Sequence, residues 1–440
     1  MSDDFFGDLS WRGLIYQTTD PDRLRQWLGT ASRSVYAGFD PTADSLHAGH
    51  FLPLVTLRRF QRAGHRPIAL IGGATGMIGD PSGKSEERNL LSLDVLRANV
   101  EAIERQMRRV LDFDAGDHEA VLVNNYDWMS RFSCLDFLRD IGKNFPVNVM
   151  LAKDSVKSRL ERTDGGISYT EFSYMLLQAY DFVHLYDQFG CELQIGGSDQ
   201  WGNITAGIDL ARRMRGAQLY GFTLPLLTRS DGAKMGKTES GAVWLSAEKT
   251  SPYAFHQYWF NVADEDVGKC LRLLTELGHD ELESLDQSRQ EEPHQRSSQR
   301  CLARELTRMV HGETALESAE HAARVLFGAA IEELDDGTLL EIFADVPSRE
   351  VPRAQLADGG LALVDALVMT GLAATKGEAR RAIEQGGAYV NNRREGNLDA
   401  RLTVAHLASQ SVIVLRRGKK NYALLRFLEK AAVAENEPPR

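Results

Sequence analysis

The chain has 440 residues, of which 43% are hydrophobic and 26% are charged, and its formal net charge is −11. This length allows two to four domains, and no apolar run approaches the ~18 residues of a membrane span. The four cysteines, Cys134, Cys191, Cys270 and Cys301, lie far apart without a CxxC pair, so neither a zinc site nor a disulfide framework is indicated. The acidic start, MSDDFFGDLSWRG, lacks the pattern of a signal peptide, and we expect a cytoplasmic protein.

The net negative charge is unevenly distributed. The segment from Leu361 to Phe427 contains eleven Lys and Arg and five Asp and Glu, so it carries a net charge of +6 within an acidic chain. Such asymmetry indicates a module that contacts nucleic acid, attached to a body that binds something else. A solvated basic surface is the alternative.

The first half of the chain predicts alternating strands and helices. β-rich apolar runs at 34–40 and 66–76 flank an amphipathic helix at 51–64, and this βαβ unit implies a doubly wound parallel sheet. A later strand at 192–197 precedes a helix that starts near Trp201. Helices dominate from about 230 to 328, residues 346–360 are rich in turn formers and predict a linker, and the tail after Glu429 looks frayed.

The motif DPTADSLHAGH (40–50) lies between the first strand and its helix. His47 and His50 are three residues apart and project to one side of the helix start, while Gly49 permits close approach of a ligand. A helix N-terminus beneath two imidazoles suits polyphosphate, although a metal pair or two surface histidines are the alternatives. The position after the first parallel strand favours a nucleotide.

Two further basic loops predict phosphate contacts. GDPSGKSEER (79–88) follows the second strand and offers Asp80, Lys84 and Arg88, without a clean match to the phosphate-binding loop pattern. KMGKT (234–238) is a glycine-containing loop whose two lysines can reach a phosphate chain. Taken alone, KMGKT would be better interpreted as a surface loop with lysines.

YMLLQAYD (174–181) places a phenol, an amide and a carboxylate on one helical face. Tyr174, Gln178 and Asp181 follow at i, i+4 and i+7 within mostly apolar surroundings. An unpaired buried polar group costs about 1–3 kcal/mol, so this line requires partners, either other side chains or a ligand. GGSDQWGN (196–203) then ends a strand with paired glycines and a polar Asp199–Gln200 step.

In this order and spacing, HAGH, GDPSGK, YMLLQAYD with GGSDQWGN, and KMGKT resemble the class I aminoacyl-tRNA synthetases, most narrowly the bacterial tyrosyl enzymes. The resemblance runs from about Leu9 to Phe427. It implies a Rossmann-like catalytic domain at 1–230 with a dimer-contact insertion at about 126–172. It further implies an α-helical anticodon-arm domain at 231–345, an RNA-binding domain at 361–428 and a homodimer.

The resemblance also implies an amino-acid pocket. Tyr36 and Asp181 would hold the phenol hydroxyl of tyrosine, and phenylalanine would leave both groups unpaired. The residues around the rest of the substrate would be Asp80, Tyr174, Gln178 and Gln200. No insertion is long enough for an editing domain, as in a site that discriminates by hydrogen bonds alone.

ATP is the implied co-substrate, with Mg²⁺ accompanying it and no dedicated metal cage in the protein. Attack by the ionised tyrosine carboxylate needs no general base, so catalysis consists of positioning and charge stabilisation. The residues implied for this work are Thr42, His47, His50, Lys84, Arg88, Lys234, Lys237 and Thr238. Those implied to hold ATP and the adenylate also include Gly38, Asp40, Gly197, Asp199 and Gln200. Gly236, where many class I enzymes have serine, predicts a looser loop.

The C-terminal segment (361–427) predicts two helices, a short strand and a hairpin, and resembles a small RNA-binding domain of a ribosomal protein. We expect it to bind tRNA through Lys376, Arg380, Arg381, Arg393, Arg394, Arg416, Arg417, Lys419 and Lys420. A tryptophanyl enzyme, an adenylyltransferase and a non-enzymatic RNA-binding protein are the rival interpretations. The Tyr36–Asp181 pair argues against the first of these, and KMGKT with the basic module argues against the second. The third leaves the catalytic motifs unexplained.

Overall fold

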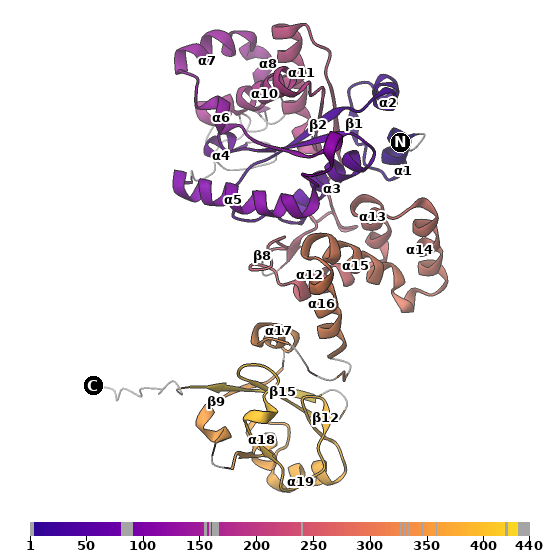
Figure 1. Cartoon of the computed structure of the whole chain (residues 1–440), viewed down its shortest axis with the longest axis vertical. Coiled ribbons are helices and arrows are strands. Elements are labelled where there is room, and N and C mark those ends of the chain that lie inside the picture. Colours follow the sequence, from indigo (N-terminus) through magenta and orange to yellow (C-terminus); the bar gives the residue numbers. More distant parts are fainter. Residues whose placement is uncertain are drawn as a thin grey trace, which may run out of the picture. The chain divides into compact units, whose positions relative to one another are not determined.

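Figure 1 shows the computed structural model of the chain. It describes residues 4–429, except 81–90, 154–155, 158–159, 161–166, 239–240, 326–327, 330, 332–333, 345, 358 and 419–420. The chain forms two compact units: Met1–Thr250 with Tyr258–His311, and Ser251–Gln257 with Gly312–Arg440. Across the described parts of the chain, the helices are all too short or too polar to span a membrane.

The first unit is built on a six-stranded sheet in the order β1-β6-β5-β2-β3-β4. The strands are β1 (Gln17–Thr18), β2 (Ser34–Phe39), β3 (Arg66–Ile71), β4 (Val121–Asn124), β5 (Leu193–Gly197) and β6 (Tyr220–Leu224). All neighbours pair in parallel except β1, which is antiparallel to β6. The doubly wound parallel sheet predicted from the sequence is therefore confirmed. Its strand order reverses between β2 and β5, and such a switch point is where this class of sheet binds ligands.

Helices connect and cover these strands. They are α1 (Phe5–Trp11), α2 (Pro21–Thr30), α3 (Ala48–Arg62), α4 (Thr75–Ile78), α5 (Leu93–Val110), α6 (Tyr126–Met129), α7 (Cys134–Asp140), α8 (Val147–Leu151), α10 (Tyr169–Phe189) and α11 (Trp201–Arg215). The predicted helices at 51–64 and after Trp201 correspond to α3 and α11. Two short strands, β7 (Lys237–Thr238) and β8 (Gly241–Ala242), follow the sheet as an antiparallel pair.

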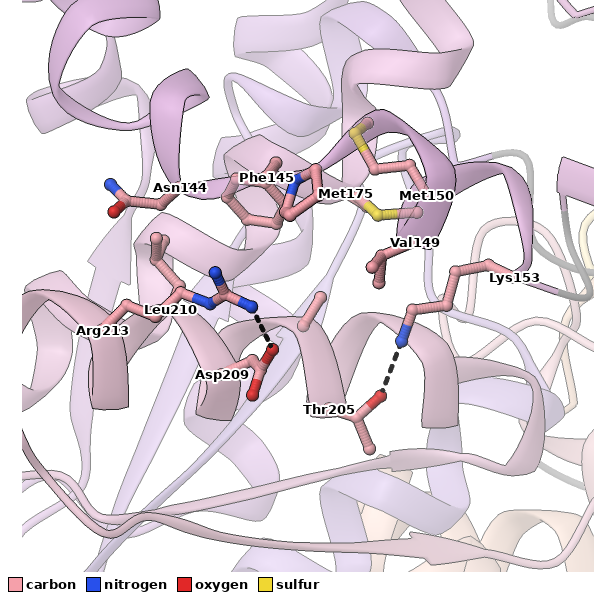
Figure 2. A pocket seen from close by; sticks show the side chains of 12 residues that line it. Asn144, Phe145, Val149, Met150, Lys153, Met175, Thr205, Asp209, Leu210 and Arg213 are labelled. Atoms are coloured by element: carbon pink, nitrogen blue, oxygen red, sulfur yellow. Dashed lines mark hydrogen bonds and ion pairs between the residues drawn. The ribbon is translucent and has the colours of Figure 1, made fainter.

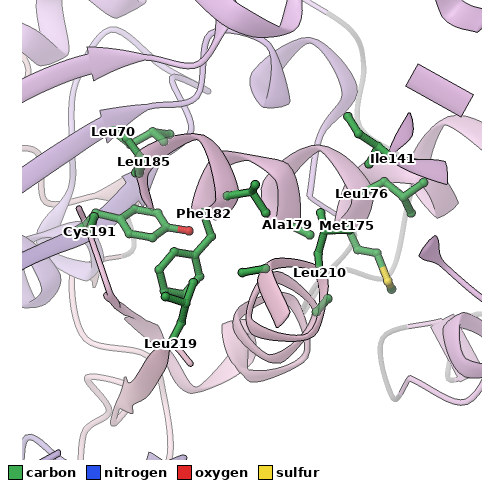
Figure 3. Packing of buried hydrophobic residues seen from close by; sticks show 14 of the residues in the cluster. Leu70, Ile141, Met175, Leu176, Ala179, Phe182, Leu185, Cys191, Leu210 and Leu219 are labelled. Atoms are coloured by element: carbon green, nitrogen blue, oxygen red, sulfur yellow. The ribbon is translucent and has the colours of Figure 1, made fainter. Parts of the chain in front are cut away.

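Helix α10 is the buried helix that carries the YMLLQAYD motif. Ser168 caps its N-terminus by accepting from the Glu171 backbone N–H, and Gly190 ends it in a left-handed conformation with φ 59°. Its apolar face packs against α11, where Phe182 fills the space left by Gly207. Figure 3 shows this core, with Phe182, Ala179 and Met175 following one another along the helix and Leu210 beside Met175. The packing fixes α10, and so fixes its polar line at the edge of the sheet.

Four helices follow the sheet: α12 (Pro252–Phe260), α13 (Asp264–Leu274), α14 (His279–Glu291) and α15 (Ser297–His311). Arg59 of α3 is buried and donates to carbonyl oxygens at the end of α13, including those of Arg272 and Thr275. Burial lowers the pKa of its guanidinium to about 9. The helix that begins at the HAGH motif is thereby attached to the helical part of its unit.

The second unit is built on a five-stranded sheet in the order β12-β11-β14-β15-β9, and β10 and β13 form a separate pair. Its elements are α16 (Glu313–Val325), α17 (Asp336–Ile342), β9 (Ser348–Pro352), β10 (Leu361–Ala362), α18 (Leu363–Met369), α19 (Lys376–Glu384), β11 (Ala388–Val390), β12 (Arg393–Arg394), β13 (Arg401–Leu402), β14 (Val412–Arg417) and β15 (Asn421–Leu428). One sheet face packs on α18 and α19, and the other packs on α16 and α17.

Two boundaries differ from those expected. Residues 346–360, expected as a linker, contain β9 and a 3₁₀ turn at Arg353–Leu356, and Val351 and Leu356 lie in the core. β9 pairs in parallel with β15, a partner 76 positions away that local turn formers do not reveal. Helices α16 and α17, expected in the domain 231–345, pack on the C-terminal sheet because their apolar faces cover Val412, Val414 and Leu424.

Candidate active site

A pocket of about 380 Å³ opens at the ends of β2 and β5, where the strand order of the sheet reverses. Fourteen residues expected at the site line it: Tyr36, Gly38, Asp40, Thr42, His47, His50, Asp80, Tyr174, Gln178, Asp181, Gly197, Asp199, Gln200 and Lys234. Lys84 and Arg88 lie outside the described residues. Lys237 and Thr238 form β7, and only their backbone is described.

One end of the pocket is closed by the carboxylate of Asp181, which is 1% exposed. Its two oxygens accept from Asn125 Nδ2 at 3.0 Å and from Trp128 Nε1 at 2.9 Å. Burial raises the pKa of Asp181 to about 7, although both hydrogen bonds act in the opposite direction. The group is therefore a buried acceptor whose charge changes near neutral pH.

Tyr36 lies at the same end and is also 1% exposed. Burial, reinforced by the negative charge of Asp181, raises the pKa of its phenol well above the ordinary value, so the hydroxyl is neutral and can donate. Among the described residues, none accepts or donates a hydrogen bond at its Oη. A buried hydroxyl in that state costs about 1–3 kcal/mol, which a polar ligand atom reaching this end of the pocket would recover.

Carboxylates and amides surround the middle of the pocket. Gln200 Nε2 donates to Asp80 Oδ2 at 2.7 Å and to Asp199 Oδ2 at 3.0 Å, and Gln178 Nε2 donates to Gln200 Oε1 at 3.3 Å. The Tyr174 hydroxyl donates to Asp40 Oδ2 at 3.0 Å. The concentration of acceptors favours a cationic group, such as an ammonium, at this position.

The third part of the pocket is the N-terminus of α3. His47 is the N-cap residue, and its Nδ1 accepts from the Gly49 backbone N–H at 3.0 Å. In the neutral ring the proton therefore resides on Nε2, which makes that nitrogen a donor. The rings of His47 and His50 stack with centroids 3.9 Å apart. Two imidazoles above a helix N-terminus form a site for anionic phosphate oxygens.

The KMGKT loop lies against this helix start. Gly236 has φ 80°, its N–H donates to Tyr258 Oη at 2.6 Å, and a Cβ built on it would lie 2.5 Å from the Cβ of Ala48. Glycine at this position allows the loop to contact α3 closely, and the looser loop expected from Gly236 stays a prediction. The contact brings the HAGH and KMGKT motifs to one side of the pocket.

Comparisons with known proteins agree with this geometry. A family model for "tRNA synthetases class I (W and Y)" matches residues 30–328, and one for the "Tyrosine--tRNA ligase SYY-like C-terminal domain" matches 340–425. Tyrosine–tRNA ligase of Rhodopirellula baltica is 59% identical over 420 residues, covering 96% of this chain and 95% of the relative, and that of Roseiflexus castenholzii is 55% identical over 96% and 99%. The chain belongs to the tyrosine–tRNA ligases.

A solved structure extends the likeness to three dimensions. The C-terminally truncated mitochondrial tyrosyl-tRNA synthetase of Aspergillus nidulans has a TM-score of 0.66 at 31% identity, covering 74% of this chain and 94% of that one. The class I synthetase fold expected from the motifs is therefore confirmed, and ATP is the co-substrate of this class.

The sequence did not predict four polar residues of this ligase site. Thr75 donates to Asp40 Oδ1 at 2.7 Å, and Asn125 Nδ2 contacts both Thr75 Oγ1 at 3.1 Å and Asp181. These contacts connect Asp40 to Asp181 through Thr75 and Asn125, and Trp128 is the other donor to Asp181. The fourth residue, Gln194 of β5, lines the pocket and is 2% exposed, and no described residue bonds its Oε1. A glutamine inside an otherwise apolar strand was the signal that could have identified it.

The basic residues expected to bind RNA lie in the second unit, apart from Lys419 and Lys420, which lie outside the described residues. Arg380 and Arg381 lie on α19, and Arg393 and Arg394 form β12. Two more have acidic partners: Lys376 pairs with Asp365 at 2.6 Å, and Arg417 pairs with Glu378 at 2.7 Å. The latter pair places the end of β14 beside the start of α19. The guanidinium of Arg416 lies 3.8 Å from the ring centroid of Tyr389.

Proposed function

We propose that this tyrosine–tRNA ligase recognises its amino acid by enclosing the phenol between Tyr36 and Asp181. The single observation that carries the proposal is a buried hydroxyl donor and a buried carboxylate acceptor lining the same pocket, close enough that, besides burial, the charge of Asp181 raises the pKa of Tyr36. The phenol O–H of tyrosine donates to Asp181 while its oxygen accepts from Tyr36. Phenylalanine has neither group, so the Tyr36 hydroxyl would remain without a partner and Asp181 would keep only its bonds from Asn125 and Trp128.

The α-ammonium of the substrate is then placed among Asp80, Tyr174, Gln178 and Gln200. The mutual hydrogen bonds of Asp80, Gln178 and Gln200 support this assignment, because they hold acceptors around one point. Gln178 Oε1 is buried and has no hydrogen-bond partner in the described part of the chain, so it is available to accept from the ammonium. This placement directs the carboxylate of tyrosine away from the phenol end.

ATP is proposed to bind beside α3, with His47 Nε2–H directed at its phosphates. The helix end contributes the positive end of its dipole, because the Ala48 and Gly49 N–H groups already donate within the protein. Gly38, Asp40, Thr42, His50, Gly197, Asp199 and Lys234 surround this part of the pocket. From the motifs, Lys84, Arg88, Lys237 and Thr238 are assigned to the same phosphates. Asp40, Asp80 and Asp199 already accept hydrogen bonds from protein side chains, so Mg²⁺ is proposed to enter with ATP, held by phosphate oxygens.

The reaction then proceeds in two steps. The tyrosine carboxylate attacks the α-phosphorus, the bond to the β-phosphate oxygen breaks, and pyrophosphate leaves with the electron pair. The cationic and N–H groups stabilise the charge that develops on it. In the second step a ribose hydroxyl of the 3′-terminal adenosine of tRNA(Tyr) attacks the adenylate carbonyl, and AMP leaves.

ATP–pyrophosphate exchange on the full chain without tRNA tests the pocket assignment. Tyrosine, tryptophan and phenylalanine are offered separately. Exchange with tyrosine alone is expected. Exchange with tryptophan at a comparable rate would keep the fold and refute the roles of Tyr36 and Asp181, and absence of exchange would refute the activity itself.

A homodimer is proposed through the segment 126–172. Half of the large hydrophobic side chains exposed in the described parts of the chain lie there: Tyr126, Leu135, Leu138, Val147, Val149, Leu151, Leu160 and Tyr169. Beside them a pocket of about 170 Å³ separates α8 from α11, where Lys153 donates to Thr205 and Arg213 pairs with Asp209 (Figure 2). Exposed apolar clusters of this kind mark protein contacts.

Light scattering on Leu135→Asp/Val147→Asp tests the dimer. The wild type is expected to have the mass of two chains and the variant that of one. Val404→Asp, an exposed apolar position in the second unit, is the matched control and leaves the dimer intact. A monomeric wild type would refute the proposal.

The second unit is proposed to bind tRNA through its basic residues on α19, β12 and β14. Affinity is then expected to fall steeply with salt, because neutralised phosphates release counterions. The test is filter binding of tRNA(Tyr) to the full chain and to Arg380→Gln/Arg381→Gln at several salt concentrations. The variant should bind less tightly and with a smaller salt slope, whereas an unchanged slope would show that these residues do not contact phosphates.

A cytoplasmic location, expected from the sequence, is also proposed, and the free thiols of Cys134 and Cys301 are consistent with it.

A further inference from the structure

The three residues Val243–Leu245, which belong to neither signature motif, bridge both of them. The Ala48 N–H donates to the Val243 carbonyl at 2.9 Å, and the Leu245 N–H donates to the Leu46 carbonyl at 2.8 Å. On the other side, the Val243 N–H donates to the Gly236 carbonyl at 2.7 Å. One short segment therefore hydrogen-bonds the HAGH turn and the KMGKT loop simultaneously.

This arrangement places Trp244 directly opposite His47. The two hydrogen bonds flank that pair, so His47 and Trp244 form a non-hydrogen-bonded antiparallel pair, in which side chains approach most closely. Their rings meet edge to face, with centroids 6.0 Å apart and planes inclined by 61°. The indole thus contacts the imidazole that carries the proposed phosphate donor.

Further contacts with Lys249 and Thr250 fix the position of Trp244. The Lys249 ammonium lies 5.2 Å from the indole centroid and pairs with Asp44 Oδ1 at 2.7 Å. The backbone N–H of Trp244 donates to Thr250 Oγ1 at 3.0 Å. Asp44 belongs to the same turn as His47. A closed set of contacts, Asp44–Lys249–Trp244–His47, therefore fixes the indole relative to the turn.

We infer that Trp244 is a positioning residue for tyrosine activation. It acts through His47, and it couples the orientation of the His47 ring to the position of the KMGKT loop. The indole restricts rotation of the imidazole while the Gly49 N–H fixes its tautomer, so Nε2–H is aimed before ATP binds. A donor that is oriented in advance stabilises the negative charge that develops on the departing pyrophosphate in the transition state. Trp244 does not line the pocket, so the affinity for tyrosine is not expected to depend on it.

A double-mutant cycle in the ATP–pyrophosphate exchange assay tests the inference on the full chain. Trp244→Ala is expected to lower kcat about tenfold and leave KM for tyrosine within twofold. In a His47→Asn background the same change should lower kcat less than twofold, because the group that Trp244 positions is gone. Trp27→Ala, which removes an indole packed on Tyr220 in the same unit, is the control and leaves kcat unchanged.

Two further variants keep the test informative if Trp244→Ala unfolds. Trp244→Phe retains an aromatic ring against His47 and should restore most of kcat, whereas Lys249→Met removes only the cation behind the ring and should cost a fewfold loss that also disappears with His47→Asn. Equal losses in both backgrounds, or a parallel rise in KM for tyrosine, would overturn the inference. A wild type inactive with tyrosine would instead refute the proposed function, which is a separate outcome.

Discussion

The indole N–H of Trp128 donates to one carboxylate oxygen of Asp181 over 2.9 Å, while Asn125 donates to the other oxygen over 3.0 Å. Both donors stabilise the charged form of a carboxylate that burial strongly disfavours. The result of this opposition is a pKa of about 7 at the end of the pocket assigned to the substrate phenol. Several measurable properties depend on this balance.

The affinity for tyrosine is expected to depend on pH. The folded-state pKa of Asp181 is raised, so the carboxylate is ionised above about pH 7 and protonated below it. The protonated form is a poorer acceptor for the phenol proton, and Kd for tyrosine should therefore rise roughly tenfold between pH 8 and pH 6. Equilibrium dialysis with labelled tyrosine measures this, with Asp181→Asn as the pH-independent control. A flat wild-type profile would show that Asp181 does not titrate there.

Trp128→Phe should move that profile to higher pH. The substitution removes one donor to Asp181 but keeps a ring stacked on His184, whose ring centroid lies 4.2 Å from that of Trp128. The carboxylate loses stabilisation, its pKa rises further, and tyrosine binding at pH 7 is expected to weaken about tenfold with partial recovery at pH 8.5. The measurement is the midpoint of Kd against pH. A midpoint that stays at the wild-type value would contradict the assigned role.

Tyr36→Phe is expected to lower the selectivity for tyrosine over phenylalanine without lowering the stability of the unliganded protein. The buried hydroxyl has no partner among the described residues, so its removal should leave the unliganded protein as stable or stabilise it by about 1 kcal/mol. The ratio of kcat/KM for tyrosine to that for phenylalanine should fall roughly tenfold to a hundredfold. Thermal unfolding and pyrophosphate exchange report the two effects. A loss of Tm with unchanged selectivity would indicate a purely structural hydroxyl.

Gly236→Ala should slow activation through two separable effects. A side chain at φ 80° is strained by about 1–2 kcal/mol, and its Cβ would overlap that of Ala48. The expected result is an approximately tenfold loss in kcat for pyrophosphate exchange with unchanged KM for tyrosine. Adding Ala48→Gly removes the overlap but not the strain, so it should recover only part of the loss. Full activity of the single variant would mean that the loop does not need this contact.

Much of the site could be predicted because class I chemistry is concentrated in short motifs, at strand ends and on one helix face. HAGH, YMLLQAYD and GGSDQWGN each contribute residues of one pocket, and a parallel sheet brings its carboxyl-side strand ends to one edge. The helical spacing of Tyr174, Gln178 and Asp181 was sufficient to place them on one face.

The supporting residues could not be predicted in the same way. Trp128 and Asn125 reach Asp181 from more than 50 positions away, and an indole or amide in a polar stretch has no spacing that assigns it a partner. The link between Trp244 and His47 likewise depends on a tertiary β-bridge. The linker expected at 346–360 was wrong for the same reason, since the strand within it is stabilised by residues near the end of the chain.

The pairing of β9 with β15 also has a consequence for biosynthesis. β9 is made early in its unit, but its partner is the last strand of the sheet, and Leu424–Leu428 lie opposite Ser348–Pro352. During translation β9 therefore remains without this partner until Leu424–Leu428 have left the ribosome. The catalytic sheet has all its strands by Leu224, long before that moment. A newly made chain is thus expected to complete the amino-acid pocket, whose lining ends at Ala242, before it completes the basic surface that we propose for tRNA.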